Sequence, residues 1–213
     1  MFFRYQYGKT IIHPHSELPM NPEKEQIKPM LMNELGYLPE SIDILLEKGT
    51  LQKYPRGRVV IECGKCCPDV FILKSGIMRF VDMNGDRERT FGFALPGTLF
   101  FSKHSFVMHE PSYYLVESCC DSELLVISHA DFWKAAEESH DLALWMLRYA
   151  HGELFYQEYK NAVVHNGSAA ERYKKMVADR PEIIRNVSQK MIASYLGVSP
   201  EYLCKLKKQM LHS

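Results

Sequence analysis

Charged side chains near the end of the chain lie on one face of a predicted helix. Leu203 and Leu206 follow Pro200 at helical spacing and predict the buried face of this helix. Its outer face carries the polar and charged residues Glu201, Tyr202, Lys205 and Lys208. Lysines on an exposed helix face can pair with phosphates, so this arrangement has the chemistry of a nucleic-acid interface.

A second short helix precedes this one, and a tight turn separates the two. Ser188 can cap its start, because a serine hydroxyl accepts hydrogen bonds from the free N–H groups of a first helical turn. Gly197 can end it in the left-handed conformation, and Ser199 can cap the next helix. Residues 188–208 therefore predict a helix-turn-helix, whose second helix enters the DNA major groove. The alternative is an ordinary helical hairpin.

The basic charge of the chain is concentrated in the same region. The 213 residues carry 26 basic and 26 acidic side chains and therefore no net charge. Residues 171–213 contain nine lysines or arginines and four acidic residues, which gives this segment a charge of +5 and leaves −5 on the remainder. A basic module on a neutral protein is expected where phosphates are bound.

Short strands separated by glycines dominate residues 51–128. Strand composition occurs in the runs 59–61, 70–73, 77–81 and 123–127. The glycines at the corners are Gly57, Gly64, Gly76, Gly85 and Gly97. Residues 83–86, Met-Asn-Gly-Asp, predict a hairpin turn. Regularly spaced strands with turn signals indicate a small sandwich or barrel.

Three of these runs resemble a known domain. They read YPRGRVVI at residues 54–61, VFILKSGIMRF at 70–80 and GDRERTFGFALPG at 85–97, and they are similar to the cyclic-nucleotide-binding domain. Followed by a helix-turn-helix, they resemble the cyclic-AMP receptor protein/FNR family of bacterial transcription regulators. The resemblance covers roughly residues 26–211, and the order of the pieces on one chain is its most specific feature.

The resemblance implies an α+β fold. Residues 26–140 would form an N-terminal antiparallel β-roll of the jelly-roll-like, double-stranded β-helix type. Residues 141–166 would form a long dimerisation helix, and residues 167–213 the helix-turn-helix domain. Residues 1–25 show no periodicity and predict a loosely ordered extension. Ser168 and Glu171 have the spacing of a capping box, which opens the first helix of the last domain.

Two apolar stripes run along the predicted long helix. One has spacings of three and four, predicts a coiled-coil seam, and consists of Leu142, Trp145, Tyr149, Gly152, Tyr156, Tyr159 and Val163. Leu144, Leu147 and Leu154 form the other, which we expect to pack on the β-roll. The alternative is a helix buried within one subunit. Two stripes favour contacts with two surfaces, and the resemblance likewise implies a homodimer interface here.

The effector pocket is also located by the resemblance. In the family, a Pro-Gly corner and a short cassette bind the nucleotide through a glutamate and an arginine with a hydroxyl partner. The matching pocket residues here are Gly97, Thr98, Leu99, Phe100, Ser112 and Tyr113. Thr98 or a close neighbour replaces the glutamate, and Ser112 and Tyr113 replace the arginine and its partner. Lys103 is the only cation of the cassette, and a lysine offers no bidentate fork. We therefore expect that the effector is not cyclic AMP; an apolar or aromatic effector and no effector at all both remain open.

The DNA contacts follow from family position. Glu201 would accept a hydrogen bond from a cytosine amine, and Lys205 would contact a guanine. The phosphate backbone would be contacted by Ser188, Gln189, Ser199, Lys207 and Lys208. Two recognition helices related by a two-fold axis would lie ~34 Å apart, which predicts a palindromic site in double-stranded DNA. RNA polymerase and a small effector of unknown identity are further candidate partners.

Cysteines offer an alternative chemistry. Cys63, Cys66, Cys67, Cys119 and Cys120 suggest a metal-responsive or redox-responsive regulator. Only one C-x-x-C pair is present, so we expect no bound metal or cofactor. A thiol switch at Cys66 or Cys67 remains an alternative, and so does a ligand-binding module whose helix-turn-helix contacts protein.

Motifs of other protein classes are missing from the sequence. There is no G-x-S-x-G, P-loop or H-E-x-x-H motif, so we expect no enzyme and assign no catalytic residue. No signal peptide and no run of ~20 apolar residues is present. We therefore expect a cytoplasmic protein without a membrane partner.

Overall fold

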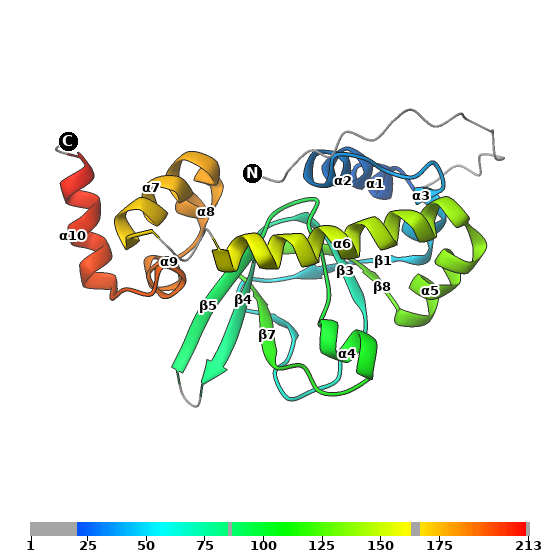
Figure 1. The fold of residues 1–213 in the computed structure, drawn as a ribbon, viewed down its shortest axis with the longest axis horizontal. Helices are drawn as coiled ribbons and strands as arrows, with labels where there is room; N and C mark the ends of the chain where they lie inside the picture. Colours follow the sequence, from blue (N-terminus) through cyan, green and yellow to red (C-terminus); the bar gives the residue numbers. More distant parts are fainter. Residues whose placement is uncertain (1–20, 85–86, 163–166, 212–213) are drawn as a thin grey trace.

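The fold consists of a β-roll that is preceded and followed by helices in the sequence. The computed structural model describes residues 21–84, 87–162 and 167–211. A long helix runs across the roll, and the C-terminal helices lie beyond one end of it (Figure 1). Within these ranges, no helix is long and apolar enough to cross a membrane.

Two four-stranded antiparallel sheets form the β-roll. Their strand orders are β1-β8-β3-β6 and β2-β7-β4-β5. The strands are β1 (Thr50–Tyr54), β2 (Val59–Ile61), β3 (Val70–Ser75), β4 (Met78–Asn84), β5 (Arg87–Ala94), β6 (Leu99–Phe100), β7 (Tyr114–Ser118) and β8 (Ser122–Ile127). β4 and β5 pair as far as Asn84 and Arg87, as the hairpin predicted at residues 83–86 requires, and residues 85–86 lie outside the described residues. The fold is thus a mixture of helices and antiparallel sheets with a jelly-roll-like domain.

Strand β3 lies between two apolar cores. Phe71 and Leu73 belong to the core between the two sheets. Val70 and Ile72 pack on the other side, against α3 (Ile42–Lys48), α5 (His129–Glu138) and α6 (His140–Ala162). Successive strand residues point to opposite faces, so the uninterrupted apolar run of β3 reflects a strand that is covered on both sides.

The described residues near the N-terminus are helical. They form α1 (Pro22–Glu25) and α2 (Ile27–Leu35). The prediction of a loosely ordered extension over residues 1–25 is therefore corrected for residues 22–25, while residues 1–20 lie outside the described residues. Asn21 caps α1 by accepting a hydrogen bond from the Glu23 N–H at 2.9 Å, and Pro22 suits a first helical position. Ile27 and Leu31 are fully buried in the core beside α3, which anchors α2.

The long helix α6 buries the opposite stripe from the one expected. Leu142 and Trp145 are in the core of the same chain, at 0% and 2% exposure, and Tyr149 packs beside them and donates a hydrogen bond to the Leu99 carbonyl at 2.7 Å. The stripe expected to pack on the roll is exposed: Leu144 by 39%, Leu147 by 52% and Leu154 by 66%. The predicted seam is thus corrected at its first three positions, because their side chains already fill a core within the chain. Gly152 is exposed; the side chains of Tyr156 and Tyr159, and the whole of Val163, lie outside the described residues.

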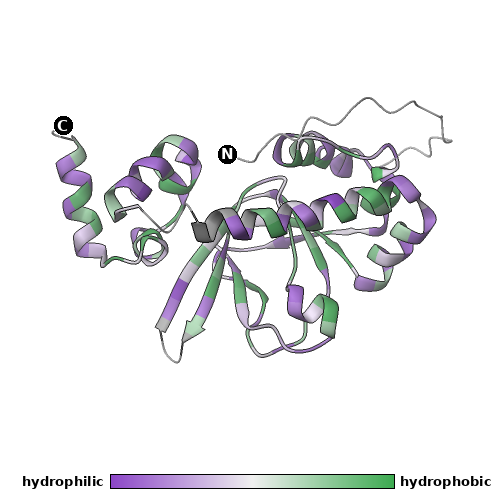
Figure 2. Ribbon diagram, in the orientation of Figure 1, coloured by the Kyte–Doolittle hydropathy of each residue, from purple (hydrophilic) through white to green (hydrophobic). Residues whose placement is uncertain are grey.

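Four helices make up the described C-terminal part of the chain. They are α7 (Ala169–Asp179), α8 (Pro181–Asn186), α9 (Gln189–Leu196) and α10 (Pro200–Leu211). The predicted capping box at Ser168 and Glu171 is confirmed at the start of α7. Their apolar faces share a core that contains Tyr173, Met176, Ile192, Leu196 and Leu203. Apolar and polar residues consequently alternate around α10 (Figure 2).

Candidate nucleic-acid interface and effector pocket

The C-terminal helix pair, α9 and α10, is held at its turn by local hydrogen bonds. The Ser188 hydroxyl accepts from the Met191 N–H at the start of α9, and Gly197 ends this helix with a left-handed φ of 68°. The Ser199 hydroxyl accepts from the Tyr202 N–H at 3.2 Å and opens α10. These caps satisfy N–H groups that would otherwise lack partners within the helices, so the turn is well determined.

Arg172 adds a support that the sequence pattern did not reveal. Its guanidinium donates to the Gly167 carbonyl at 2.6 Å and to the Leu196 carbonyl at 2.7 Å. The second contact satisfies a carbonyl at the end of α9, where helix carbonyls lack backbone partners and favour a cation. Arg172 therefore ties α7 to the C-terminal helix pair. The sequence shows a basic side chain four residues after Ser168, but this spacing does not predict that it donates to the Leu196 carbonyl.

The outward face of α10 is polar and accessible. Leu203 and Leu206 are buried, whereas Glu201, Tyr202, Cys204, Lys205 and Lys208 are exposed. Hydrogen bonds from its own backbone N–H and from the Ser199 hydroxyl lower the pKa of the Glu201 carboxyl. This carboxylate is therefore an acceptor at neutral pH. Of the other predicted DNA contacts, Gln189 and Ser199 are exposed, and Ser188 and Lys207 are half-buried.

The Pro-Gly corner brings four of the predicted effector-pocket residues together. Gly97 has a φ of 93°, and a Cβ atom here would collide with the Met30 carbonyl of α2. Thr98 closes the turn, since its hydroxyl accepts from the Leu95 N–H at 3.2 Å. Leu99 and Phe100 are buried in β6. The corner is therefore packed tightly beneath α2 rather than open to a ligand.

The other two predicted pocket residues face elsewhere. Ser112 is buried, and its backbone pairs with the loop that follows β2: the Gly64 N–H donates to the Ser112 carbonyl at 2.8 Å. Tyr113 is 69% exposed, and its ring packs on His104 of α4 (Lys103–Met108) at 4.2 Å between centroids. The structure thus does not bring Tyr113 to the interior of the roll. Neighbouring residues of an extended chain point to opposite faces, so the sequence could have predicted that Tyr113 and Tyr114 do not both face the interior.

Aromatic side chains line the interior of the roll. Phe71 stacks on Phe100 at 5.3 Å, and Phe80 meets Phe100 edge-on at 5.5 Å. Tyr114 contacts both Phe80 and Phe91, and its hydroxyl donates to the Phe101 carbonyl at 2.8 Å. Burial raises the pKa of Tyr114 to about 12, so this phenol stays neutral. The interior is therefore apolar and lined by the protein's own rings, of which Phe71 and Phe100 are buried and Phe80, Phe91 and Tyr114 half-buried.

The cation of the predicted cassette is engaged in an ion pair. Lys103 Nζ lies 2.8 Å from Glu153 Oε2 on α6. Arg79, on β4, points out of the roll and lies 2.9 Å from Glu88 and 2.5 Å from Glu117. Each of these cations is thus neutralised by a carboxylate. A cyclic phosphate needs a cationic fork and backbone donors, and neither residue offers that fork in this arrangement.

The cysteines divide between exposed and buried positions. Cys63 and Cys66 are exposed on the loop after β2, while Cys67 is half-buried beside the roll interior. Burial raises the pKa of the Cys67 thiol to about 11 and that of the buried Cys119 thiol to about 12. Thiols with such pKa values react slowly. Over the described ranges, no group of three or more His, Cys, Asp or Glu side chains could hold a metal ion.

Comparison with known proteins identifies the domain and the fold. The sequence model of the cyclic nucleotide-binding domain matches residues 51–139. No curated protein matches the chain. The structure of FixK2 from Bradyrhizobium japonicum superposes with a TM-score of 0.62 at 20% identity, covering 77% of this chain and 85% of that one.

Two other solved regulators superpose over most of their length. For the catabolite activator protein of Thermus thermophilus, the TM-score is 0.53 at 19% identity, covering 85% of this chain and 86% of that one. For CLP, the c-di-GMP-responsive global regulator of Xanthomonas campestris, it is 0.59 at 15% identity, covering 81% of this chain and 91% of that one. Residues 51–139 thus match a cyclic nucleotide-binding domain, and the described chain has the fold of Crp/Fnr-type regulators.

Proposed function

We propose that this protein is a homodimeric, sequence-specific DNA-binding transcription regulator whose effector is not cyclic AMP. The observation that carries this proposal is the outward face of α10, where Glu201, Tyr202 and Lys205 are exposed on a helix whose other face is buried. An exposed helix that is braced by a second helix can enter the major groove. The fold shared with solved regulators supports the same assignment.

The contacts with DNA would divide between base edges and phosphates. Glu201 would accept from a cytosine N4 amine, and Lys205 would donate to guanine O6 or N7. Tyr202 would lie beside them in the groove. Ser188, Gln189, Ser199, Lys207 and Lys208 would contact the backbone, which sets the register but carries no sequence information.

The second copy would bind along the outward face of α6. Leu144, Leu147 and Leu154 are spaced by three and seven residues, so they share one face, and all are substantially exposed. An exposed apolar stripe on a long helix can be covered by the same stripe of a second copy around a two-fold axis. Gly152 would lie beside this interface. The two copies of α10 would then reach a palindromic site with half-sites ~34 Å apart.

The roll would respond to an apolar effector or serve only as a scaffold. Its interior is lined by Phe71, Phe80, Phe91, Phe100 and Tyr114, and Lys103 is paired with Glu153. A cyclic nucleotide would have to displace these rings and would find no arginine in the cassette. RNA polymerase remains an expected partner for a regulator of this kind.

Selection of DNA by the full-length protein tests the proposal. Duplexes with random centres are selected on the purified protein, and the enriched sequence is titrated by fluorescence anisotropy at 50 to 200 mM salt. We expect a palindrome, and an affinity that falls steeply with salt because bound phosphates release counterions. No enrichment and no salt-dependent binding would instead favour a module whose C-terminal helix pair contacts protein.

A thiol-responsive regulator is the second candidate. Cys63 and Cys66 are both exposed on one loop with two residues between them, and this loop hydrogen-bonds to the loop before β7 through Gly64 and Ser112. Oxidation by peroxide would form a disulfide and release water. DNA affinity measured with dithiothreitol and with peroxide, for the wild type and for Cys63→Ser, distinguishes this candidate, since only a thiol switch would make the wild type respond.

A further inference from the structure

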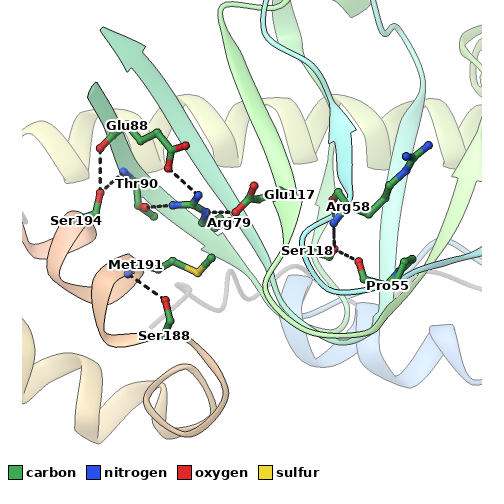
Figure 3. Close-up of polar contacts among 10 residues, drawn as sticks. All are labelled: Pro55, Arg58, Arg79, Glu88, Thr90, Glu117, Ser118, Ser188, Met191 and Ser194. Atoms are coloured by element: carbon green, nitrogen blue, oxygen red, sulfur yellow. Dashed lines mark hydrogen bonds and ion pairs between the residues drawn. The ribbon is translucent and has the colours of Figure 1, made fainter. Parts of the chain in front are cut away.

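The free edge of one sheet is covered by helix α9. β5 is the last strand in the order β2-β7-β4-β5, so one row of its backbone groups has no neighbouring strand. The Thr90 N–H donates to the Ser194 hydroxyl at 2.9 Å, and this hydroxyl donates to the Glu88 carbonyl at 3.3 Å (Figure 3). One side chain thus satisfies a donor and an acceptor that a further strand would otherwise pair.

The same stretch of β5 is held from its other side by a buried arginine. Arg79 donates to the Glu88 carboxylate at 2.9 Å, to Glu117 at 2.5 Å and to the Thr90 hydroxyl at 3.3 Å (Figure 3). The Arg79 side chain is only 8% exposed. Glu88 and Thr90 are therefore fixed by side-chain contacts to β4 and β7 and by backbone contacts to α9. The edge of β5 is therefore a rigid surface on which α9 packs.

Apolar contacts extend the docking beyond the hydrogen bonds. The rings of Phe93 on β5 and Tyr195 on α9 lie 5.4 Å apart. Ile77 and Cys119 of the roll are buried in the same core as Ile192 and Leu196 of α9. The roll and the C-terminal helix pair are thus joined by one continuous core, within which the Ser194 hydroxyl supplies the directional contact.

The docked helix leaves the proposed reading face uncovered. Ser194 and Tyr195 of α9 face the roll, whereas Glu201, Tyr202 and Lys205 of α10 remain exposed. The two helices share a buried core through Leu196 and Leu203. The position of α9 on β5 therefore sets the direction of α10 without blocking it.

We propose that Ser194 is a positioning residue for DNA recognition, because its contacts with β5 hold the C-terminal helix pair in one orientation relative to the roll. This inference rests on the proposed function. A regulator that binds two half-sites must present both recognition helices at a set separation and angle. If the contact is lost, each helix pair gains orientational freedom, and this freedom must be removed again when DNA binds. Ser194 thus contributes to affinity although it touches no DNA in this scheme.

Three variants of the full-length protein test the role of Ser194. Ser194→Ala removes the hydroxyl, and Ser194→Thr keeps it. The matched control is Ser168→Ala, which removes a serine in the same part of the chain whose hydroxyl bonds to Glu171 and caps α7. Each variant is titrated with the selected palindrome and with a single half-site, and amide hydrogen exchange is followed in segments that contain Thr90.

We expect Ser194→Ala to weaken binding of the full palindrome by about five- to tenfold, the equivalent of roughly one hydrogen bond. The half-site should be affected much less, since one helix pair can turn freely to reach it, and Ser194→Thr should restore most of the affinity. Exchange near Thr90 should become faster in Ser194→Ala alone. A merely structural role would weaken both duplexes equally, as Ser168→Ala would if it lowered the stability of the helices.

Two results would overturn the inference. The first is fast exchange of Thr90 in the wild type, which would mean that the contact does not persist in solution. The second is faster exchange in Ser194→Ala with unchanged affinity for the palindrome. If the wild type binds no DNA, the proposed function fails. The hydrogen-exchange comparison still decides in that case whether Ser194 holds α9 against β5, and without DNA binding its positioning role in recognition is rejected.

Discussion

The exposed stripe on α6 leads to a quantitative prediction for the pair Leu147→Ala and Leu154→Ala. A leucine-to-alanine change removes three carbon groups, which are worth about 2.4 kcal/mol when they are fully buried, at about 0.8 kcal/mol per group. Leu154 is 66% exposed in one copy, so covering it in a dimer would gain about 1.6 kcal/mol for each copy. Leu147, at 52% exposure, would gain about 1.2 kcal/mol for each copy.

These values are converted to affinity through the two-fold symmetry of a dimer. Because both copies lose the side chain, Leu154→Ala should weaken dimerisation by about 3 kcal/mol, or roughly 200-fold in Kd. Together with Leu147→Ala, the loss should reach about 6 kcal/mol, which would make the protein a monomer at micromolar concentration. Sedimentation equilibrium over a range of concentrations measures this directly, and circular dichroism checks that the fold is retained.

The control is Glu137→Ala, which removes an exposed side chain from α5, away from the leucine stripe of α6. We expect it to dimerise as the wild type does. A wild type that sediments as a monomer, or a double variant that dimerises with unchanged affinity, would refute the assignment of this face. A dimer that is lost only when Leu142 is changed would instead return the interface to the stripe that the sequence predicted.

Three further predictions concern the DNA contacts, the roll and the pH dependence of stability. Glu201→Ala should relax specificity at one base pair at a cost of ~1–3 kcal/mol, whereas Lys207→Ala should weaken all sequences alike; equal weakening of every sequence by Glu201→Ala in a binding-site selection would reject base reading. Cyclic AMP at 1 mM should leave the Tm unchanged, because aromatic rings line the roll and its cassette has no arginine to bind a cyclic phosphate; a concentration-dependent rise in Tm would contradict this. Burial raises the pKa of the Asp141 carboxyl, but hydrogen bonds from Ser139 and Ser41 outweigh it and place the pKa below its usual value. A depressed folded-state pKa stabilises the protein above the unfolded value of 3.8, and this contribution is lost as the pH falls through the folded-state pKa. In urea unfolding series from pH 7 to pH 3, Asp141→Asn should therefore be less stable than the wild type at pH 7, and the difference should shrink toward pH 3; a constant difference would argue against the carboxylate.

The aromatic rings that line the interior determine how a ligand could affect the rest of the chain. Domains of this kind can respond to a ligand only if binding alters contacts that reach the rest of the chain. In this protein, β5 contacts α9 through Phe93 and also carries Phe91, whose ring meets Phe80 of β4. A small apolar molecule that moved these rings would therefore act on the edge that holds Ser194. An effector screen is best directed at small apolar compounds.

Local features of this protein were determined by the sequence alone. The capping box at Ser168, the end of α9 at Gly197 and the hairpin between β4 and β5 all depend on residues within a few positions of one another. A hydroxyl near free N–H groups, or a glycine where a left-handed φ is needed, acts in the same way in most surroundings. The alternation of short strands with glycines indicated a small sandwich or barrel, and the family resemblance implied that it is an antiparallel roll.

Only the tertiary structure decided which surfaces are inside. Both stripes of α6 are apolar and helically spaced, so periodicity could not tell that Trp145 enters the core while Leu147 faces outward. The helix α1, by contrast, has local signals in Asn21, which caps it, and in Pro22 at its first position. Ser194 is the clearest case: serine is common on helix surfaces, and its role exists only because the edge of β5, more than 100 residues earlier, needs a donor and an acceptor at that point. Burial and hydrogen-bond pairing between distant segments are properties of the assembled fold, and no local pattern encodes them.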